Sequence, residues 1–163
     1  MTLQAFDWIA KHAAAQPEAP ALNDLRSGRH YTYAQMHDRL DRCAQFLHER
    51  CGVGQGDRVA LLMHNCSDAV EVIFACWRLG AICVPMNWRL AVPEIVFILK
   101  DSQPRLLIHT PEFAENAHAA LAQHDGDVML VAAADGAPSI YESGLRPRMA
   151  PCRRWSTPST TPG

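Results

Sequence analysis

Several features that mark special classes of protein are missing from this 163-residue sequence. The longest apolar run, residues 69–79, is interrupted by Glu71 and Arg78, and it falls far short of the roughly 20 residues that a membrane span needs. Asp7 and Lys11 break up the apolar positions near the N-terminus, so no secretory signal peptide is predicted. The formal net charge of −2 provides no basic face, which argues against a nucleic-acid-binding protein.

The six cysteines and eight histidines show none of the spacings typical of metal or redox sites. No Cys-x-x-Cys pair occurs, and no cysteine pairs with histidine at zinc-site spacing. The favoured interpretation is therefore a cytoplasmic protein with buried, reduced thiols, and a disulfide framework is the alternative. No metal site is predicted.

What the sequence does contain is an alternation of short apolar strands with helices. Strands are predicted at residues 58–63, 81–85, 105–109 and 127–131. Helices are predicted at residues 5–14, from 32 onwards, from about 65 to 79, from 93 onwards and at 112–123, with a hairpin joining 21–23 to 30–32. Strand, helix and strand in succession make βαβ units, so we predict an α/β fold with a parallel sheet.

Local signals mark the ends of several helices. Thr32 followed three residues later by Gln35 is the capping-box pattern. Asn65 or Ser67 is expected to cap the helix that ends at Leu79, and Gly80 suits the left-handed position after it. That helix is apolar almost all round, so we expect it to be deeply buried.

Two tryptophans invite a binding interpretation. Trp77 lies on the apolar helix, so packing in the core is favoured over lining an acyl pocket. Trp88 follows a strand end, where binding loops often lie, and both alternatives stay open for it. His37 and Asp41, four residues apart, are interpreted as part of a solvated helix face rather than a catalytic dyad.

Glycines at 52, 54 and 56 resemble part of a nucleotide-binding fingerprint, which would require them after a strand and before a helix. They follow a helix and precede a strand instead, so a helix end and a turn are predicted.

The composition changes near residue 143. The stretch 143–163 contains no acidic residue but four prolines and four arginines, and its apolar periodicity is lost. We therefore predict one domain at 1–142 and a disordered tail at 143–163, and we hypothesise that a frameshift near Leu145 produced the tail.

Four segments carry a resemblance to a known family. They are residues 31–36 (YTYAQM), 56–65 (GDRVALLMHN), 75–90 (ACWRLGAICVPMNWRL) and 99–108 (LKDSQPRLLI). In this order they resemble the adenylate-forming, or AMP-binding, superfamily, and the Asn-Trp-Arg-Leu ending of the third is typical of its acyl-CoA ligases. The resemblance runs from about Phe6 to about Val131, and it implies the parallel βαβ layers of the N-terminal subdomain, incomplete. One departure is Val92, which stands where the family usually has a Thr or Ser helix cap.

The resemblance implies an ancestral synthesis of acyl-CoA from a carboxylic or fatty acid, ATP and coenzyme A, with Mg²⁺ as cofactor. The family's phosphate loop and catalytic lysine lie downstream of these segments, and neither Lys11 nor Lys100 has a suitable context. We therefore assign no catalytic, cofactor-binding or metal-binding residue, expect no cofactor in this fragment, and expect it to be inactive alone. The alternatives are a stand-alone interaction module and a nucleotide-binding regulator. A fragment without its partner segments is expected to expose apolar surface and to self-associate through it.

Overall fold

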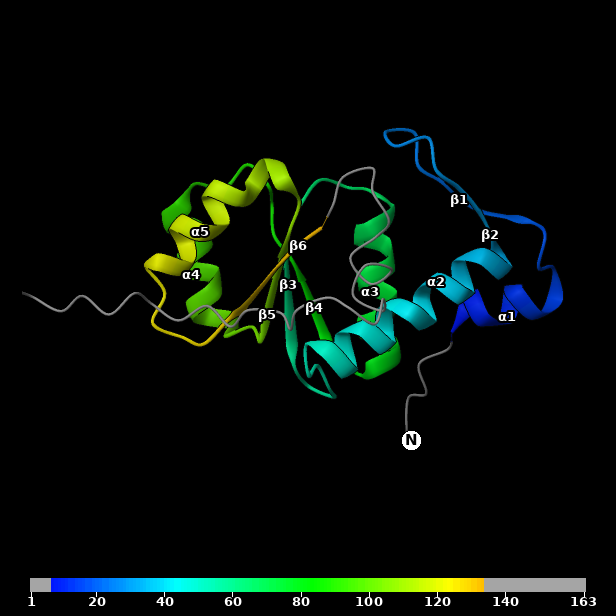
Figure 1. The fold of residues 1–163 in the computed structure, drawn as a ribbon, viewed down its shortest axis with the longest axis horizontal. Coiled ribbons are helices and arrows are strands. Elements are labelled where there is room, and N and C mark those ends of the chain that lie inside the picture. The colour runs from blue at the N-terminus through cyan, green and yellow to red at the C-terminus, as the bar shows by residue number, and fades with distance from the viewer. Residues whose placement is uncertain (1–6, 134–163) are drawn as a thin grey trace, which may run out of the picture.

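A computed structural model of the chain describes residues 7–133. Within them, a parallel sheet lies between two layers of helices, and a short antiparallel hairpin projects from one layer (Figure 1). The predicted α/β fold class is confirmed. The predicted domain boundary at 142 and the predicted tail at 143–163 lie outside the described residues.

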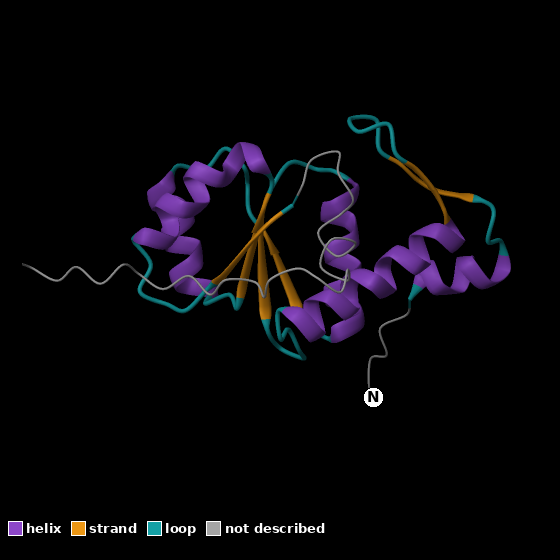
Figure 2. Cartoon of the chain, in the orientation of Figure 1, coloured by secondary structure: helices purple, strands orange, loops and turns teal. Residues whose placement is uncertain are grey.

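The elements follow the predicted order, with small shifts at their ends (Figure 2). The helices are α1 (Trp8–Ala15), α2 (Tyr33–Gln45), α3 (Ser67–Leu79), α4 (Val92–Ser102) and α5 (Ala114–Ala122). A π-helical turn, η1 (Phe46–Arg50), extends α2, and a 3₁₀ turn, η2 (Pro111–Phe113), precedes α5. The strands are β1 (Pro20–Asn23), β2 (His30–Thr32), β3 (Arg58–Leu62), β4 (Ile82–Pro85), β5 (Leu106–His109) and β6 (Met129–Ala132). No described helix has the length and apolar character needed to cross a membrane.

The main sheet has the order β4-β3-β5-β6, and its strands run parallel. Successive side chains of a strand point to opposite faces, so β3 serves two separate cores. Val59 and Leu61 pack with α2, η1 and α3, whereas Ala60 and Leu62 pack with α4 and α5. Covering both faces explains why β3 and β5 are almost continuously apolar.

The hairpin leads directly into α2 through the predicted cap. Thr32 Oγ1 accepts a hydrogen bond from the Gln35 N–H, and Gln35 Oε1 accepts one from the Thr32 N–H. The capping box is therefore confirmed. Gly80 is also confirmed as the left-handed end of α3, with φ of 66°.

The predicted cap of α3 was wrong. Cys66 occupies the N-cap position without a capping side chain, and neither Asn65 nor Ser67 caps the helix. Asp24, in the turn after β1, accepts the buried Ser67 N–H at 2.9 Å instead. The cap thus comes from a residue 43 positions away, which local patterns cannot indicate.

The expected deep burial of α3 was wrong in part. Its inward face carries two buried carboxylates, Asp68 and Glu71, whereas Ile73 and Trp77 are exposed. Trp77 is 48% exposed and its ring lies 5.7 Å from that of Phe74, so the prediction of core packing was wrong. The helix buries its carboxylates because arginines from the hairpin and from α2 pair with them.

The start of α4 also differs from the expectation. Ala91, rather than Val92, holds the N-cap position. Glu94 Oε2 accepts the Ala91 N–H at 2.7 Å, so the first turn keeps half of a capping box despite lacking a Thr or Ser. The glycines at 52, 54 and 56 lie in the turn between η1 and β3, as predicted.

Candidate functional site at the carboxyl edge of the sheet

The carboxyl edge of the sheet contains a reversal of winding. The chain goes from β3 to β4 on one side, then crosses back to place β5 on the other side of β3. Open α/β sheets bind ligands outside the carboxyl ends of their strands at such a reversal. The segments that follow β3, β4 and β5 are therefore the candidate site.

An aromatic cluster gathers there from three separate strand ends. His64 follows β3, Trp88 follows β4 and Phe113 follows β5. The His64 ring centroid lies 4.5 Å from that of Trp88 and 5.0 Å from that of Phe113, both edge to face. The Arg89 guanidinium lies 4.1 Å from a Trp88 ring centroid, a cation–π contact. Flat apolar surfaces beside polar edges can hold the body of an organic ligand.

Charged groups border this cluster. Glu112 Oε1 lies 3.8 Å from His64 Nε2 and accepts a hydrogen bond from Arg26 Nη2 at 3.3 Å. Burial alone would raise the pKa of Glu112, but its own backbone N–H and the charges of Arg26 and His64 outweigh burial and lower it. Glu112 is therefore ionised near neutral pH.

His109 ends β5 beneath the same edge. Its side chain is buried, and burial lowers its pKa despite a hydrogen bond to the backbone of Thr110. Because the Thr110 carbonyl oxygen can only accept, the 2.9 Å contact is made by an Nδ1–H of His109. The buried imidazole of His109 is therefore neutral near neutral pH and adds no charge to the carboxyl edge of the sheet.

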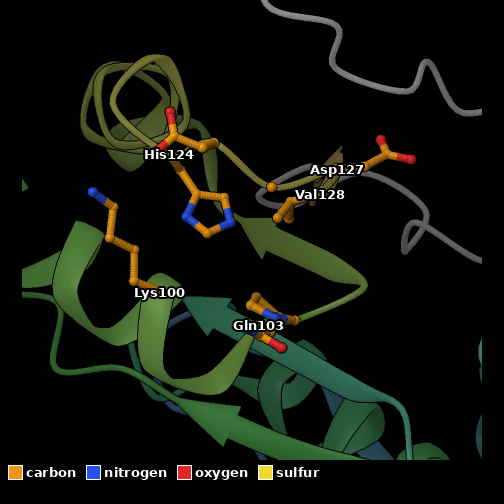
Figure 3. A pocket seen from close by; sticks show the side chains of 8 residues that line it. Lys100, Gln103, His124, Asp127 and Val128 are labelled. Atoms are coloured by element: carbon orange, nitrogen blue, oxygen red, sulfur yellow. The ribbon is translucent and has the colours of Figure 1, made fainter.

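A pocket of about 460 Å³ opens at the opposite, amino edge, beside the starts of β5 and β6. Figure 3 shows Lys100, Gln103, His124, Asp127 and Val128 around it. The pocket therefore lies away from the reversal of winding. Among residues 7–133, no three His, Cys, Asp or Glu side chains are grouped so as to hold a metal ion.

The comparisons with known proteins identify the family. A model of the AMP-binding enzyme family matches residues 9–156. The chain belongs to the AMP-binding enzyme family.

Its relatives in this family are longer proteins. The chain is 44% identical over 112 residues to a feruloyl-CoA synthase of an Amycolatopsis species, which covers 69% of the chain and 22% of the relative. It is 38% identical over 117 residues to the long-chain-fatty-acid–CoA ligase FadD13 of Mycobacterium tuberculosis, covering 72% and 23%.

Solved structures give the same result for the fold. The N-terminal domain of FACL13 from Mycobacterium tuberculosis matches with a TM-score of 0.73 and 34% identity, over 83% of this chain and 34% of that one. A fatty acyl CoA synthetase of the same organism matches with a TM-score of 0.74 and 32% identity, over 92% and 29%. The resemblance to the N-terminal part of acyl-CoA ligases is confirmed. This chain spans 22–23% of the length of the two curated relatives above.

The residues singled out from the sequence of this AMP-binding family member lie in different parts of the fold. Trp88 belongs to the aromatic cluster and is also half-buried against the core on the α4–α5 face of the sheet, so its position fits both alternatives. His37 and Asp41 meet Arg78 of α3 rather than forming an isolated exposed pair, because Arg78 Nη1 donates to Asp41 Oδ1 at 2.7 Å. Lys100 lies at the amino edge, far from the aromatic cluster in the fold.

The sequence reasoning missed His64 and Glu112. A signal was available, since each lies within three residues of a predicted strand end. What the sequence could not indicate was that β3 and β5 are neighbours, and this adjacency brings the two side chains to 3.8 Å.

Proposed function

We propose that this chain supplies the first βαβ layers of an ATP-dependent acyl-CoA ligase. In such a ligase a carboxylic acid attacks the α-phosphate of ATP, which forms an acyl-adenylate and releases pyrophosphate. The sulfur of coenzyme A then attacks the acyl carbon and AMP leaves. The proposal is supported by the family match over residues 9–156 together with CoA ligases among the relatives.

We assign the chain's own contribution to the carboxyl edge. His64 and Trp88, both half-buried and in ring contact with the buried Phe113, present an aromatic wall with polar groups beside it, which suits a carboxylic acid with an aromatic or aliphatic body. The ATP phosphates and Mg²⁺ require backbone N–H groups, oxygen ligands and a lysine. Neither lysine of this sequence lies near the wall, since Lys11 is in α1 and Lys100 is in α4. We therefore expect the 163 residues alone to form no acyl-adenylate.

The test is a carboxylate-dependent exchange of labelled pyrophosphate into ATP, run on the 163-residue chain. The mycobacterial long-chain-fatty-acid–CoA ligase, assayed beside it, shows that the conditions support the reaction. We expect exchange from the ligase and none above background from this chain. Carboxylate-dependent exchange by the chain would overturn the proposed inactivity. Calorimetry with ATP, AMP and coenzyme A separates this outcome from nucleotide binding without catalysis.

Exposed apolar side chains support a second candidate function, that of an interaction module. Ile73 and Trp77 on α3, together with Ile82 on the edge strand β4, are all exposed. Exposed apolar surface of this kind favours association. Size-exclusion chromatography over a range of concentrations distinguishes the candidates. A cooperatively folding monomer at every concentration favours a module in its own right, whereas aggregation favours a part that normally packs against further protein.

A further inference from the structure

The pocket at the amino edge of the sheet contains a buried histidine with an unpaired ring nitrogen. His124 follows α5 and is 6% exposed, and its Nδ1 atom has no hydrogen-bond partner within residues 7–133. Figure 3 shows the imidazole directed into the pocket, in the space bordered by Lys100, Gln103 and Val128. Buried polar atoms of folded proteins nearly always have a partner. An imidazole that faces a cavity in this way points to a partner from outside the chain.

The chain holds this ring in place through a close approach of the backbone. The His124 N–H donates to the Leu121 carbonyl oxygen at 3.1 Å, which fixes the histidine at the end of α5. A Cβ atom added at Gly126 would collide with His124 Nε2. Only a residue without a side chain lets the turn before β6 pass so close to the imidazole. Gly126 therefore gives the ring its place in the pocket.

A cation lies beside the imidazole. Lys100 projects from the last turn of α4, and among the described residues no carboxylate forms an ion pair with it. The carbonyl oxygens at the end of a helix carry partial negative charge. Here Arg58 Nε donates to the Ser102 carbonyl oxygen at 2.8 Å, and Arg58 Nη2 donates to that of Gln103 at 2.7 Å. Because Arg58 offsets the negative end of α4, the charge of Lys100 can act on a ligand.

Two carboxylates limit the charge that such a ligand can carry. Asp125 and Asp127 also line the pocket, and both residues are exposed. Figure 3 shows the Asp127 side chain pointing away from the imidazole. Exposed carboxylates are screened by solvent, yet they repel an anion, and the repulsion grows with each added negative charge. A ligand with one negative charge is therefore favoured over a ligand with two.

We propose that the amino-edge pocket binds a small organic monocarboxylate. An oxygen of the ligand lies between Lys100 Nζ and the His124 imidazole and accepts a hydrogen bond from each. The exposed Lys100 side chain has the rotamer freedom to turn and admit the anion. The apolar body of the ligand packs on Pro104 and Val128, which are both buried. The volume of about 460 Å³ is in the range of small-molecule sites. This site lies opposite the aromatic cluster, and it does not rest on the proposed function.

A titration of the ¹⁵N-labelled 163-residue chain followed by NMR tests the proposal. The probe is butyrate, and butylamine and 1-butanol are matched controls with the same carbon body but a positive charge or none. Inorganic phosphate is the more highly charged control, and all titrations are run at equal ionic strength. We expect butyrate to cause saturable shifts of the backbone amides of residues 124–128. The two uncharged or cationic controls should not cause them, and phosphate should bind more weakly than butyrate.

Substitutions locate the binding groups. Lys100→Gln removes the charge and keeps the length of the side chain, so it should weaken butyrate binding about tenfold. Lys11→Gln removes an exposed lysine of α1, away from the pocket, and should leave binding unchanged. Gly126→Ala displaces the imidazole and should also weaken binding. Circular dichroism checks that each variant folds. Position 100 is exposed, so Lys100→Gln remains decisive if Gly126→Ala fails to fold.

Four results would overturn the proposal. Butyrate might shift no amide of residues 124–128, with any changes confined to the carboxyl edge around His64 and Trp88. Butylamine or 1-butanol binding as tightly as butyrate would show that the apolar body alone is recognised. Phosphate binding more tightly would contradict the preference for a single charge. Wild-type affinity in Lys100→Gln would remove the lysine from the site.

Discussion

Arg39 Nε donates to Glu71 Oε1 at 2.6 Å, and Arg39 Nη2 donates to Glu71 Oε2 at 3.3 Å. The Glu71 carboxylate is fully buried, and the Arg39 side chain is only 13% exposed. The guanidinium also lies 4.5 Å from the Tyr31 ring centroid. This two-pronged pair joins α2 to α3 inside one helical layer, and it explains how an otherwise apolar helix tolerates a carboxylate on its inward face.

Replacing Glu71 with alanine should strongly destabilise the fold. Removing one partner of a buried ion pair leaves the other charge without compensation, which costs about 3–5 kcal/mol. Glu71→Gln should lose less stability than Glu71→Ala, because its amide oxygen still accepts a hydrogen bond from Arg39. Urea unfolding followed by circular dichroism measures both losses. Asp38→Ala is the matched control. Its ion pair with Arg42 is exposed, so it should lose less than about 1 kcal/mol. Equal losses for Glu71→Ala and Asp38→Ala would contradict the prediction.

Glu71 should also make stability depend on pH. Burial raises its pKa from the ordinary value of 4.5 to about 7, although the hydrogen bonds and charge of Arg39 oppose the rise. Between these pH values the folded chain holds a proton that the unfolded chain has lost. The stabilisation from that proton is therefore complete below pH 4.5 and is lost as the pH rises through about 7.

The measurement is the free energy of unfolding in urea at several pH values from 4.5 to about 8 for the wild type and Glu71→Gln. Subtracting one curve from the other removes the titration of groups common to both chains. The wild type should lose stability relative to the variant as the pH rises. A flat difference would show that Glu71 titrates alike in the folded and unfolded chains.

Asp24 should matter for α3 even though it lies in the hairpin. Its carboxylate accepts the N–H groups of Ser67 at 2.9 Å, Arg26 at 3.0 Å and Ser27 at 3.2 Å. Asp24→Ala leaves the buried Ser67 N–H without this acceptor, at a cost of about 2 kcal/mol. Urea unfolding measures the loss, and Asn23→Ala, an exposed neighbour, should change stability little. An Asp24→Ala chain as stable as Asn23→Ala would mean that α3 needs no cap from the hairpin.

The alternation of elements could be predicted from the sequence because strand and helix periods are local properties. Thr32 with Gln35 and the left-handed Gly80 were predicted for the same reason, since each depends on residues a few positions apart. The cap from Asp24 and the burial of Glu71 could not be predicted. Both depend on partners that only the folded chain brings near, and an apolar helix pattern does not say which face will meet them.

Of the candidate site, too, only the part that depends on local sequence could be predicted. Trp88 stood out because it follows a strand, and strand ends are where α/β sheets bind ligands. Its neighbours His64 and Phe113 come from other strands, and their meeting depends on the strand order β4-β3-β5.

Three glycine substitutions should separate backbone strain from steric contact at the turns before β3 and β4. Gly80 has φ of 66°, and an added Cβ would lie 3.2 Å from Cγ of Gln55. Gly56 has φ of 81° but nothing within 4 Å of such a Cβ, whereas the Cβ of an alanine at 54 would meet only Asp57 Oδ2, at 3.9 Å. Alanine in the left-handed region costs roughly 1–2 kcal/mol. Gly56→Ala should therefore lose about that amount, Gly80→Ala should lose more, and Gly54→Ala should lose least. Urea unfolding of the three variants gives the order. If Gly54→Ala proved as destabilising as Gly80→Ala, the left-handed conformation at the end of α3 would not be the reason that position 80 requires glycine.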